Sequence, residues 1–132
     1  MMQGKGWLTY KNGDIFDGEF DNNQRKGYGV LYYSNGSRYM GNWNNDWKEG
    51  FGKLWENVKQ EYYEGDFSGD KKSGKGMLVK SNLEILEGNF WDDKKEGDQR
   101  SKHKMKQEEF KKIIKPFMKQ SSIRKPEVKI FE

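Results

Sequence analysis

The residues of this chain that could carry out acid–base chemistry are few and far apart. His103 is the only histidine, and it lies in a lysine-rich stretch where no neighbour could share a proton with it. Asp92 and Asp93 are adjacent, but a carboxylate pair acts as acid and base only when burial and geometry give its members different roles. We therefore expect His103 to be a solvated surface residue and the two aspartates to form a polar turn.

Metal, cofactor and phosphate chemistry also lack the residues that they need. The chain has no cysteine, which excludes disulfides and thiolate metal sites. Its Gly-x-Gly pairs do not belong to a Gly-x-Gly-x-x-Gly loop that leads from a strand into a helix and could hold a phosphate. We expect no catalytic residue, no metal site, no cofactor and no small-molecule substrate, and so we do not expect an enzyme.

The composition indicates a folded protein with a thin core. Of the 132 residues, 32% are hydrophobic and 35% are charged, yet 15% are aromatic, whereas a disordered chain would be poor in aromatics. The first residues, MMQGKGW, lack the apolar centre of a signal peptide, and no stretch is long and apolar enough to span a membrane. We expect an intracellular, soluble protein.

Charge divides the chain into two regions. Residues 1–99 carry 14 Lys and Arg against 17 Asp and Glu, a net charge of −3, whereas residues 100–132 carry 11 against 4, a net charge of +7. The boundary coincides with the end of a sequence repeat. We expect a repeat region at 1–99 and a basic helical tail at 100–132, with different partners.

A repeat of 23 or 24 residues fills the first region. A glycine flanked at two residues' distance by bulky apolar side chains recurs at Phe16–Phe20, Tyr39–Trp43, Tyr63–Phe67 and Leu86–Phe90. A second pattern, Gly-x-Gly-x-Leu, starts at Gly4, Gly27, Gly50 and Gly74, and its next glycine pair is broken by Gln99. Repetition at a fixed period of this length indicates an array of small structural units.

Each half of the repeat alternates with period two, which predicts β-strands joined as an antiparallel meander. A regular register requires a six-residue loop at Asp21–Lys26, which places Phe20 opposite Gly27. The next connection is a three-residue loop with glycine at its last, left-handed position. Loops of this second kind are predicted at Lys11–Gly13 and Ser34–Gly36, and a four-residue loop at Asn57–Gln60.

This register brings glycine and aromatic side chains together. One row of glycines crosses eight strands at Gly6, Gly18, Gly29, Gly41, Gly52, Gly65, Gly76 and Gly88. In the adjacent row, Phe20, Trp43, Phe67 and Phe90 alternate with Gly4, Gly27, Gly50 and Gly74. An aromatic ring can lie flat over a strand whose residue carries no side chain, so we expect these rings to cover glycine backbone.

The segment Tyr39–Leu54, with its Tyr-x-Gly-x-Trp and Gly-x-Gly-x-Leu patterns, resembles the MORN repeat (membrane occupation and recognition nexus). The resemblance covers about residues 4–99 and implies a mainly β fold, an elongated single-layer antiparallel meander of about eight strands. MORN repeats are known as non-catalytic scaffolds, in axonemal proteins such as radial-spoke components, in junctional membrane proteins and as appendages to enzymes. The Asp21–Gln24 loop and Gln99 depart from the pattern, so we expect the last unit to fray or change direction.

The face opposite the glycine row is predicted to bind a partner protein. A single-layer sheet cannot bury both faces against itself, and an uncovered apolar patch usually marks an interaction site. The alternatives are that twist, lysine stems or the chain's own tail cover this face. The candidate binding residues are Trp7, Tyr28, Tyr32, Phe51 and Trp55.

The tail contains one amphipathic helix. Its apolar residues follow helical spacing and are flanked by lysines, and Pro116 is expected to kink or end the helix near Lys115. The helix could cap the sheet, dock on another protein, or lie on a membrane or in a calmodulin groove. Beyond it we expect a linker at Ser121–Pro126 and a short strand at Val128–Ile130. The stripe, also a candidate partner-binding surface, is Phe110, Ile113, Ile114 and Phe117.

These features favour a structural scaffold or adaptor that binds other protein subunits in a large cytoskeletal assembly, with the ciliary axoneme as the leading expectation from the family resemblance. The alternative is a membrane-associated adaptor whose basic tail binds anionic lipid. The net charge of −3 on the repeats argues against lipid binding by the sheet. Nucleic acid is not expected, because the aromatic and basic residues lie in different regions.

Overall fold

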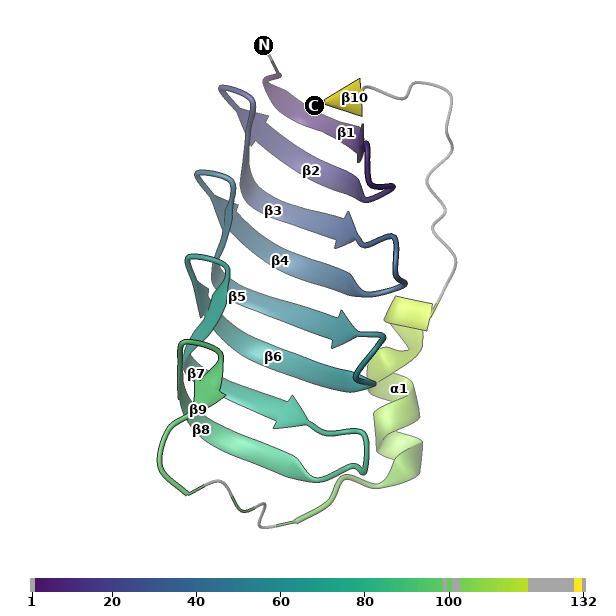
Figure 1. The fold of residues 1–132 in the computed structure, drawn as a ribbon, viewed down its shortest axis with the longest axis vertical. Coiled ribbons are helices and arrows are strands. Elements are labelled where there is room, and N and C mark those ends of the chain that lie inside the picture. The colour runs from purple at the N-terminus through teal and green to yellow at the C-terminus, as the bar shows by residue number, and fades with distance from the viewer. Residues whose placement is uncertain (1, 99, 101–102, 119–129, 132) are drawn as a thin grey trace.

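One sheet, built strand after strand, forms the body of the molecule (Figure 1). The computed structural model describes residues 2–98, 100, 103–118 and 130–131. The antiparallel strands are β1 (Gly4–Tyr10), β2 (Ile15–Asp21), β3 (Gln24–Tyr32), β4 (Arg38–Asn44), β5 (Trp47–Glu56), β6 (Glu61–Ser68), β7 (Lys71–Val79), β8 (Ile85–Trp91) and β9 (Lys94–Lys95). The mainly β, single-layer meander predicted from the sequence is therefore confirmed, followed by a helix, α1 (Gln107–Met118), and a two-residue strand, β10 (Ile130–Phe131), parallel to β1.

The predicted glycine row is confirmed at all eight strands. Neighbouring strands pair glycine with glycine throughout, as at Gly18 with Gly29 and Gly29 with Gly41. The three-residue loops are also as predicted: the Tyr33 N–H bonds to the Ser37 carbonyl at 2.9 Å across the Ser34–Gly36 loop. The four-residue loop lies between the paired residues Glu56 and Glu61. Side-chain alternation and turn chemistry thus fix the register over most of the sheet.

The predicted six-residue loop at Asp21–Lys26 is wrong. Strands β2 and β3 continue until Asp21 pairs with Gln24, which leaves a two-residue turn of Asn22 and Asn23, with φ of 51° and 67°. Two positive φ values are the signature of the tight turn that matches strand twist, and asparagine tolerates them. Phe20 consequently faces Arg25 rather than Gly27, and a register shift between Gly18 and Glu19 absorbs the two extra residues.

The rings that lie closest to the glycine row are mostly different from those predicted, although the predicted Trp43 donates its Nε1–H to the Gly29 carbonyl at 3.2 Å. A Cβ atom on Gly29, Gly52 or Gly76 would overlap the ring of Phe16, Tyr39 or Tyr63, respectively. The glycines at 4, 27, 50 and 74 do not lie beneath rings. They have φ between 71° and 95°, so glycine is required there for the irregular backbone beside the turns.

Edge-to-face aromatic contacts run along this ring face without a break. Phe16 and Trp43 lie 5.3 Å apart between ring centroids, and Tyr39 and Trp43 lie 5.1 Å apart, nearly perpendicular in each case. Perpendicular contacts suit the quadrupoles of the rings. The complete ladder is Phe20, Phe16, Trp43, Tyr39, Phe67, Tyr63 and Phe90.

Cations close the ring face from outside. The Arg25 guanidinium lies 4.3 Å from the Trp43 ring centroid and bonds the Asp46 carboxylate at 2.7 Å. Lys48 and Lys72 occupy the matching positions beside the next rings, 5.6 Å from Tyr39 and 5.5 Å from Tyr63. Such contacts are worth about 0.5–1 kcal/mol each at exposed sites. The ring face is therefore sealed by the chain's own side chains along its length.

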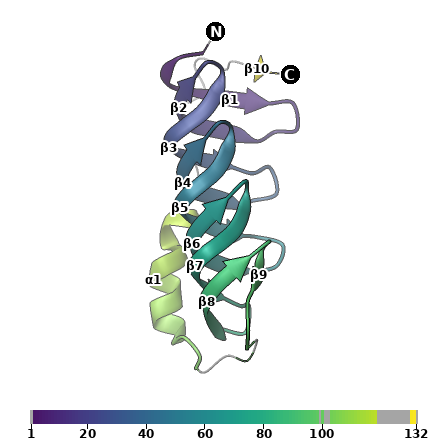
Figure 2. The same ribbon diagram turned by 90° about the vertical axis from the view of Figure 1, so that its left-hand side faces the viewer.

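The tail returns to the opposite face of the sheet. In Figure 2, α1 lies against β5–β8 on the side away from the ring face. Helix α1 includes Pro116 and extends to Met118, so the helix does not end near Lys115; the alternative, a kink at Pro116, stays a prediction. The described residue Ile130 belongs to β10, whereas Val128 and the linker expected at Ser121–Pro126 lie outside the described residues.

The outer edge of β8 is covered at both ends. Strand β9 pairs with Phe90 and Trp91, and His103–Met105 runs along the other end, where the Met105 N–H bonds to the Leu83 carbonyl at 2.8 Å. Covering an edge blocks pairing with another sheet. The last repeat thus remains regular through β8 and changes direction after it.

Candidate interaction surface

The face of the sheet opposite the rings, here called the helix face, carries two rows of side chains that cross all eight long strands. The loop-side row, nearest the three- and four-residue loops, is Thr9, Ile15, Tyr32, Arg38, Trp55, Tyr62, Val79 and Ile85. The middle row is Trp7, Asp17, Val30, Met40, Lys53, Glu64, Met77 and Glu87. Both rows follow from strand alternation once the glycine register is set.

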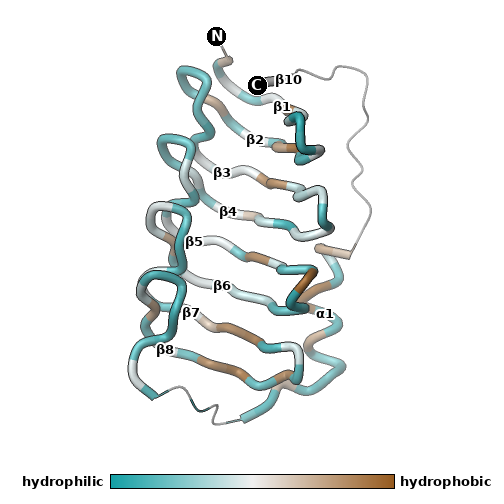
Figure 3. Tube along the Cα trace, in the orientation of Figure 1, coloured by the Kyte–Doolittle hydropathy of each residue, from teal (hydrophilic) through white to brown (hydrophobic). Residues whose placement is uncertain are grey.

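The C-terminal half of the helix face is covered by α1. The rings of Trp55 and Phe110 lie 6.1 Å apart, and those of Tyr62 and Phe117 lie 5.7 Å apart. Trp55 and Tyr62 are each only 1% exposed, and Val79 is fully buried beside them. Figure 3 shows the hydrophobic segments concentrated at this end, in β7, β8 and α1. We call this region the covered half.

Polar contacts hold the covered half in one arrangement. Arg38 donates a hydrogen bond to the carbonyl of Pro116 at 3.0 Å, next to the end of α1. The Tyr62 hydroxyl donates to Glu64 at 2.9 Å, and burial, followed by the charge of Glu64, raises the pKa of Tyr62 far above its ordinary value. The Trp55 Nε1–H is buried beneath α1 and has no acceptor among the described residues. Buried aromatic area, more than hydrogen bonding, therefore holds this half together.

No helix among the described residues lies on the N-terminal part of the helix face, which comprises β1–β4 and the exposed Phe51 on β5 (Figure 2). Tyr28 is 57% exposed and Phe51 is 48% exposed, while Trp7 and Val30 are half-buried. We call this region the open half. It differs from the covered half in keeping large aromatic side chains at the surface.

A hollow of about 300 Å³ lies within the open half. Two carboxylates and an aromatic ring contribute to its wall, Asp17 and Glu19 from β2 and Tyr28 from β3, together with Lys5, which pairs with Glu19 across the strands. Carboxylates beside an exposed ring suit a cationic side chain, because the ring face and the carboxylates both attract positive charge.

The structure separates the nine candidate binding residues into two groups. Trp55 and the α1 residues Phe110, Ile113, Ile114 and Phe117 pack against one another within the chain. Trp7, Tyr28, Tyr32 and Phe51 lie in or beside the open half. That any of the nine contacts a partner stays a prediction.

Some residues that shape this face were missed in the sequence. Tyr62 and Met105 are buried under or beside α1, and Arg38 anchors the helix end. Tyr62 lies two residues before Glu64, so strand alternation alone places both on the helix face. The part played by Met105 and Arg38 has no local signal, because it depends on the path of the tail.

The two aspartates considered for acid–base chemistry lie away from the helix face and make polar contacts at a turn. Asp92 and Asp93 form the two-residue turn before β9; Asp92 bonds Lys71 at 2.6 Å, and Asp93 accepts the Lys72 backbone N–H at 2.8 Å. These bonds are structural, because Asp46 and Asp70 occupy the same turn position and likewise bond the backbone of a preceding strand.

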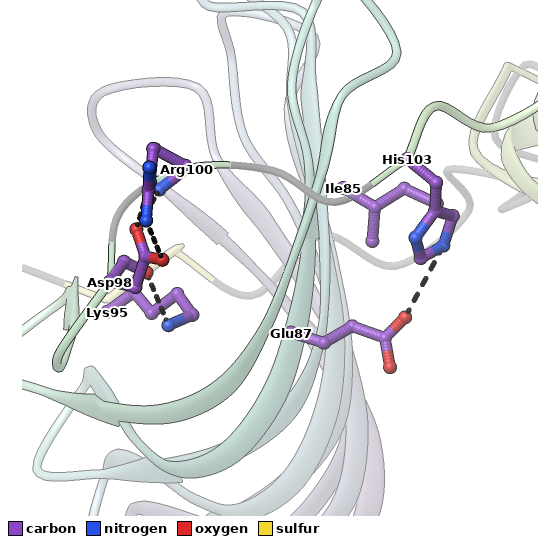
Figure 4. Close-up of a pocket in the computed structure, with 6 residues that line it drawn as sticks. All are labelled: Ile85, Glu87, Lys95, Asp98, Arg100 and His103. Atoms are coloured by element: carbon purple, nitrogen blue, oxygen red, sulfur yellow. Dashed lines mark hydrogen bonds and ion pairs between the residues drawn. The ribbon is translucent and has the colours of Figure 1, made fainter.

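A second hollow, of about 360 Å³, lies at the edge of β8 (Figure 4). His103 Nε2 is 3.9 Å from a Glu87 carboxylate oxygen on one side of β8, and Arg100 pairs with Asp98 on the other. Within residues 2–98, 100, 103–118 and 130–131 no group of three or more metal-binding side chains is found. The hollow is lined by these exposed ion pairs together with Ile85 and Lys95.

No helix in the described part of the chain is long and apolar enough to cross a membrane. Helix α1 directs its apolar stripe toward the sheet, while Lys111, Lys112 and Lys115 are exposed. The lysines of α1 therefore face solvent, and its apolar residues contact the sheet.

Comparison with known families agrees with the repeat seen in the strands. The MORN repeat model matches residues 1–15, 16–38, 39–57 and 63–82, which together make up more than half of the chain. These matches span β1 to the loop before β8. A search of curated proteins finds no significant match.

Proposed function

The chain belongs to the MORN-repeat family, and on that premise we propose that it is a non-catalytic adaptor that binds a partner protein through the open half of its helix face. MORN repeats are a non-enzymatic repeat family and are associated with protein interaction or membrane association. Of these two roles we choose protein interaction, and we assign it to the open half.

The proposal depends on one observation, which is that the two halves of the helix face differ in how far they are covered. The ring face is sealed by the aromatic ladder and its cations, and the covered half is sealed by α1. The open half keeps two large aromatic side chains, Tyr28 and Phe51, about half exposed beside the half-buried Trp7, whereas the other exposed rings of the described residues, Trp47 and Trp91, lie next to two-residue turns. Aromatic residues are enriched at the energetic centres of protein interfaces.

A protein partner is favoured over a lipid surface by the position of α1. A basic amphipathic helix binds membranes by placing its apolar side among acyl chains. Phe110, Ile113 and Ile114 pack against the sheet, so that side is occupied. The exposed lysines could add only electrostatic attraction, and the acidic repeats oppose it.

The assembly in which this adaptor works is proposed to be cytoskeletal, with the ciliary axoneme as the first place to look. Support comes from the occurrence of MORN repeats in axonemal scaffolds, which is an argument by family resemblance rather than from the geometry. A tagged full chain expressed in ciliated cells of the source organism should co-fractionate with axonemes. Its consistent absence from the axonemal fraction would remove this part of the proposal and leave the adaptor role in place.

The adaptor role is tested by disabling the open half without touching the fold. In the full chain, Trp7→Ser, Tyr28→Ser and Phe51→Ser are combined, and co-purifying subunits are quantified against the unchanged protein. The triple variant should lose its specific partner at least tenfold, because its exposed aromatic anchors are gone.

The matched control is Trp91→Ser, which removes an aromatic side chain that is 69% exposed but lies near the β8–β9 turn. The control should retain the partner. Retention of the partner by the triple variant, or equal loss in the control, would show that the open half is not the binding surface.

A further inference from the structure

A further row of side chains on the helix face, here called the turn-side row, lies next to the two-residue turns. All eight of its residues are exposed, and none belongs to the apolar cluster that α1 forms with the sheet. Helix α1 therefore does not cover this row. From β1 to β8 the row is Lys5, Glu19, Tyr28, Asn42, Phe51, Asp66, Lys75 and Asn89.

The centre of the turn-side row is symmetrical in its chemistry. Asn42 lies between the rings of Tyr28 and Phe51. A carboxylate follows beyond each ring, Glu19 on one side and Asp66 on the other. Neither carboxylate takes part in an ion pair among the described residues. The five residues thus offer two aromatic surfaces and two unpaired negative charges in a line across β2–β6.

The spacing of the two rings matches the pitch of a polyproline II helix. Tyr28 on β3 and Phe51 on β5 are two strands apart, which corresponds to about 9.6 Å at roughly 4.8 Å per strand. A polyproline II helix rises about 9.3 Å in each turn of roughly three residues. Two turns of an α-helix rise about 10.8 Å, and two residues of an extended strand about 6.8 Å, so both fit the ring spacing less well.

The polar group between the rings suits the backbone of such a helix. Polyproline II has no internal hydrogen bonds, so its carbonyl groups need donors from outside. The Asn42 side-chain amide donates one N–H to the Phe51 carbonyl at 3.3 Å, and a primary amide has a second N–H to donate. Proline-rich segments bind in grooves lined by aromatic rings. Tyr28, Asn42 and Phe51 together supply the rings and the donor that such a ligand requires.

The carboxylates indicate the charge of the ligand. Glu19 and Asp66 are four strands apart, about 19 Å, and six residues of polyproline II span about 18.6 Å. Basic residues six positions apart would therefore reach both carboxylates from the same side of the peptide. The hollow of about 300 Å³ lined by Asp17, Glu19 and Tyr28 suits one of them, because carboxylates and a ring face both attract a guanidinium.

We infer that the partner contributes a proline-rich segment in the polyproline II conformation, with two basic residues six positions apart, which crosses β2–β6 along the turn-side row. The inference rests on the proposed adaptor function and adds the conformation and composition of the bound segment. Because the chemistry of the row is symmetrical about Asn42, the segment fits in either chain direction.

The probe is a heptapeptide of five prolines with an arginine at each end, blocked at both termini and added to the full chain. Its affinity is measured by the fluorescence anisotropy of a labelled copy, and its position by NMR. We expect saturable binding that shifts the side-chain amide signal of Asn42. The indole signal of Trp55 should stay unchanged, since Trp55 lies beneath α1.

Two further peptides separate conformation and spacing from charge. Moving the second arginine two positions inward, at unchanged composition, places it on another side of the helix and should weaken binding at least fivefold. Replacing the prolines with glycine and serine keeps both charges but removes the preformed helix, and should weaken binding at least tenfold.

Substitutions in the protein locate the probe. Tyr28→Ser and Phe51→Ser should each weaken binding at least tenfold, and Asp66→Asn at least threefold. The matched control Glu87→Gln removes an exposed carboxylate of the middle row and should change binding less than twofold. Each variant is first checked for the native NMR signal of Trp55, and Tyr28→Leu or Phe51→Leu replaces a serine variant that loses it.

Several outcomes would overturn the inference. These are no saturable binding at about 1 mM peptide, equal binding of the glycine–serine peptide or of the peptide with the moved arginine, or binding that survives both Tyr28→Ser and Phe51→Ser. The adaptor role is tested separately, through the native partner and the triple variant. A partner that binds the open half in another conformation would be lost from the triple variant while the probe fails to bind.

Discussion

The covered and open halves of the helix face are built from the same repeat, yet the aromatic side chains are buried in one half and exposed in the other. In the covered half, Trp55 and Tyr62 are 1% exposed beneath α1, whereas in the open half Tyr28 is 57% exposed. The first difference is the helix α1, which packs on one half. A single layer has two faces and can bury one with its own long side chains, so the second face needs a separate element wherever it is apolar.

The loop-side row distinguishes the halves as well, whereas carboxylates occur in both, with Glu64 and Glu87 in the covered half. In the open half, Asp17 and Glu19 stand beside the aromatic residues and keep the surface hydrated. In the covered half, the loop-side row is continuously apolar from Trp55 to Ile85. An uncovered surface of that kind would favour aggregation, so α1 protects the end of the sheet where exposure would do most harm.

The largest expected effect is the loss of the central side chain of the covered half. Trp55→Ala should lower the free energy of unfolding by about 3–5 kcal/mol, since a buried ring is lost and a cavity remains beneath α1. Chemical denaturation of the full chain measures it. Loss of less than about 1 kcal/mol would mean that α1 does not pack on Trp55 in solution.

The next effect comes from α1 itself. The double change Phe110→Ser and Ile114→Ser should lower the free energy of unfolding by about 2–4 kcal/mol, because the helix loses its contacts with the covered half. Amide hydrogen exchange should then increase in β7 and β8 and remain unchanged in β2 and β3. Unchanged exchange in every strand would show that α1 is a passive extension.

On the ring face, the same substitution should cost a similar free energy of unfolding at the two ends of the sheet. Gly29→Ala and Gly76→Ala should each cost about 1–3 kcal/mol, because the new methyl group overlaps the ring of Phe16 or Tyr63. Thermal unfolding of the two variants makes the comparison. A large cost at one glycine and none at the other would contradict a ring ladder shared by both halves.

A smaller effect is expected from the phenol of the covered half. Tyr62→Phe should cost about 1 kcal/mol at neutral pH through the lost hydrogen bond to Glu64. Because burial raises the pKa of Tyr62 in the folded state, the folded chain holds this proton more tightly than the unfolded chain, in which tyrosine titrates near about pH 10. This contribution is complete below about pH 10 and is lost at higher pH.

Denaturation curves from pH 8 to 11 test whether Tyr62 makes the protein less stable as the pH rises. The unchanged protein should lose stability above about pH 10, and Tyr62→Phe should lose less over the same range. Burial also raises the pKa of Tyr39 and Tyr63, so a decline should remain in the variant. A steeper decline in Tyr62→Phe would contradict the burial of this phenol.

The smallest effects are expected in the open half. Tyr28→Ser and Phe51→Ser should each change the free energy of unfolding by less than about 0.5 kcal/mol, since side chains that are half exposed contribute little packing. Denaturation of each variant under the conditions used for Trp55→Ala gives the contrast directly. A loss above about 2 kcal/mol at either site would mean that the open half is covered in solution.

Sequence reasoning reached the strand register because the side-chain period of a strand is fixed and the glycine row leaves few ways to align it. It missed the turn at Asn22 and Asn23, where asparagines take positive φ without the expected glycine and two extra residues are absorbed beside Gly27. The sequence also did not show that Phe16, Tyr39 and Tyr63 would lie closest to the glycines of the row. Each of these rings reaches diagonally onto the next strand.

The division of the helix face could not be read from the sequence. Alternation places Trp7, Phe51 and Trp55 on one face but does not say which of them the tail will cover. That choice depends on the path from β8 through His103–Met105 and on the contact between Arg38 and Pro116, which joins residues 78 positions apart. The boundary between the two regions at residue 99 stays a prediction.

Hydroxyl-radical footprinting of the full chain, alone and within its native assembly, compares the exposure of the covered half and the open half in one experiment. We predict strong labelling of Trp7, Tyr28 and Phe51 in the isolated protein and weak labelling of Trp55 and Tyr62. In the assembly, labelling of the first group should fall several-fold, and that of the second should remain low. Unchanged labelling of the open half on assembly, or strong labelling of Trp55 and Tyr62 in either state, would contradict the division of the helix face into a sealed half and a binding half.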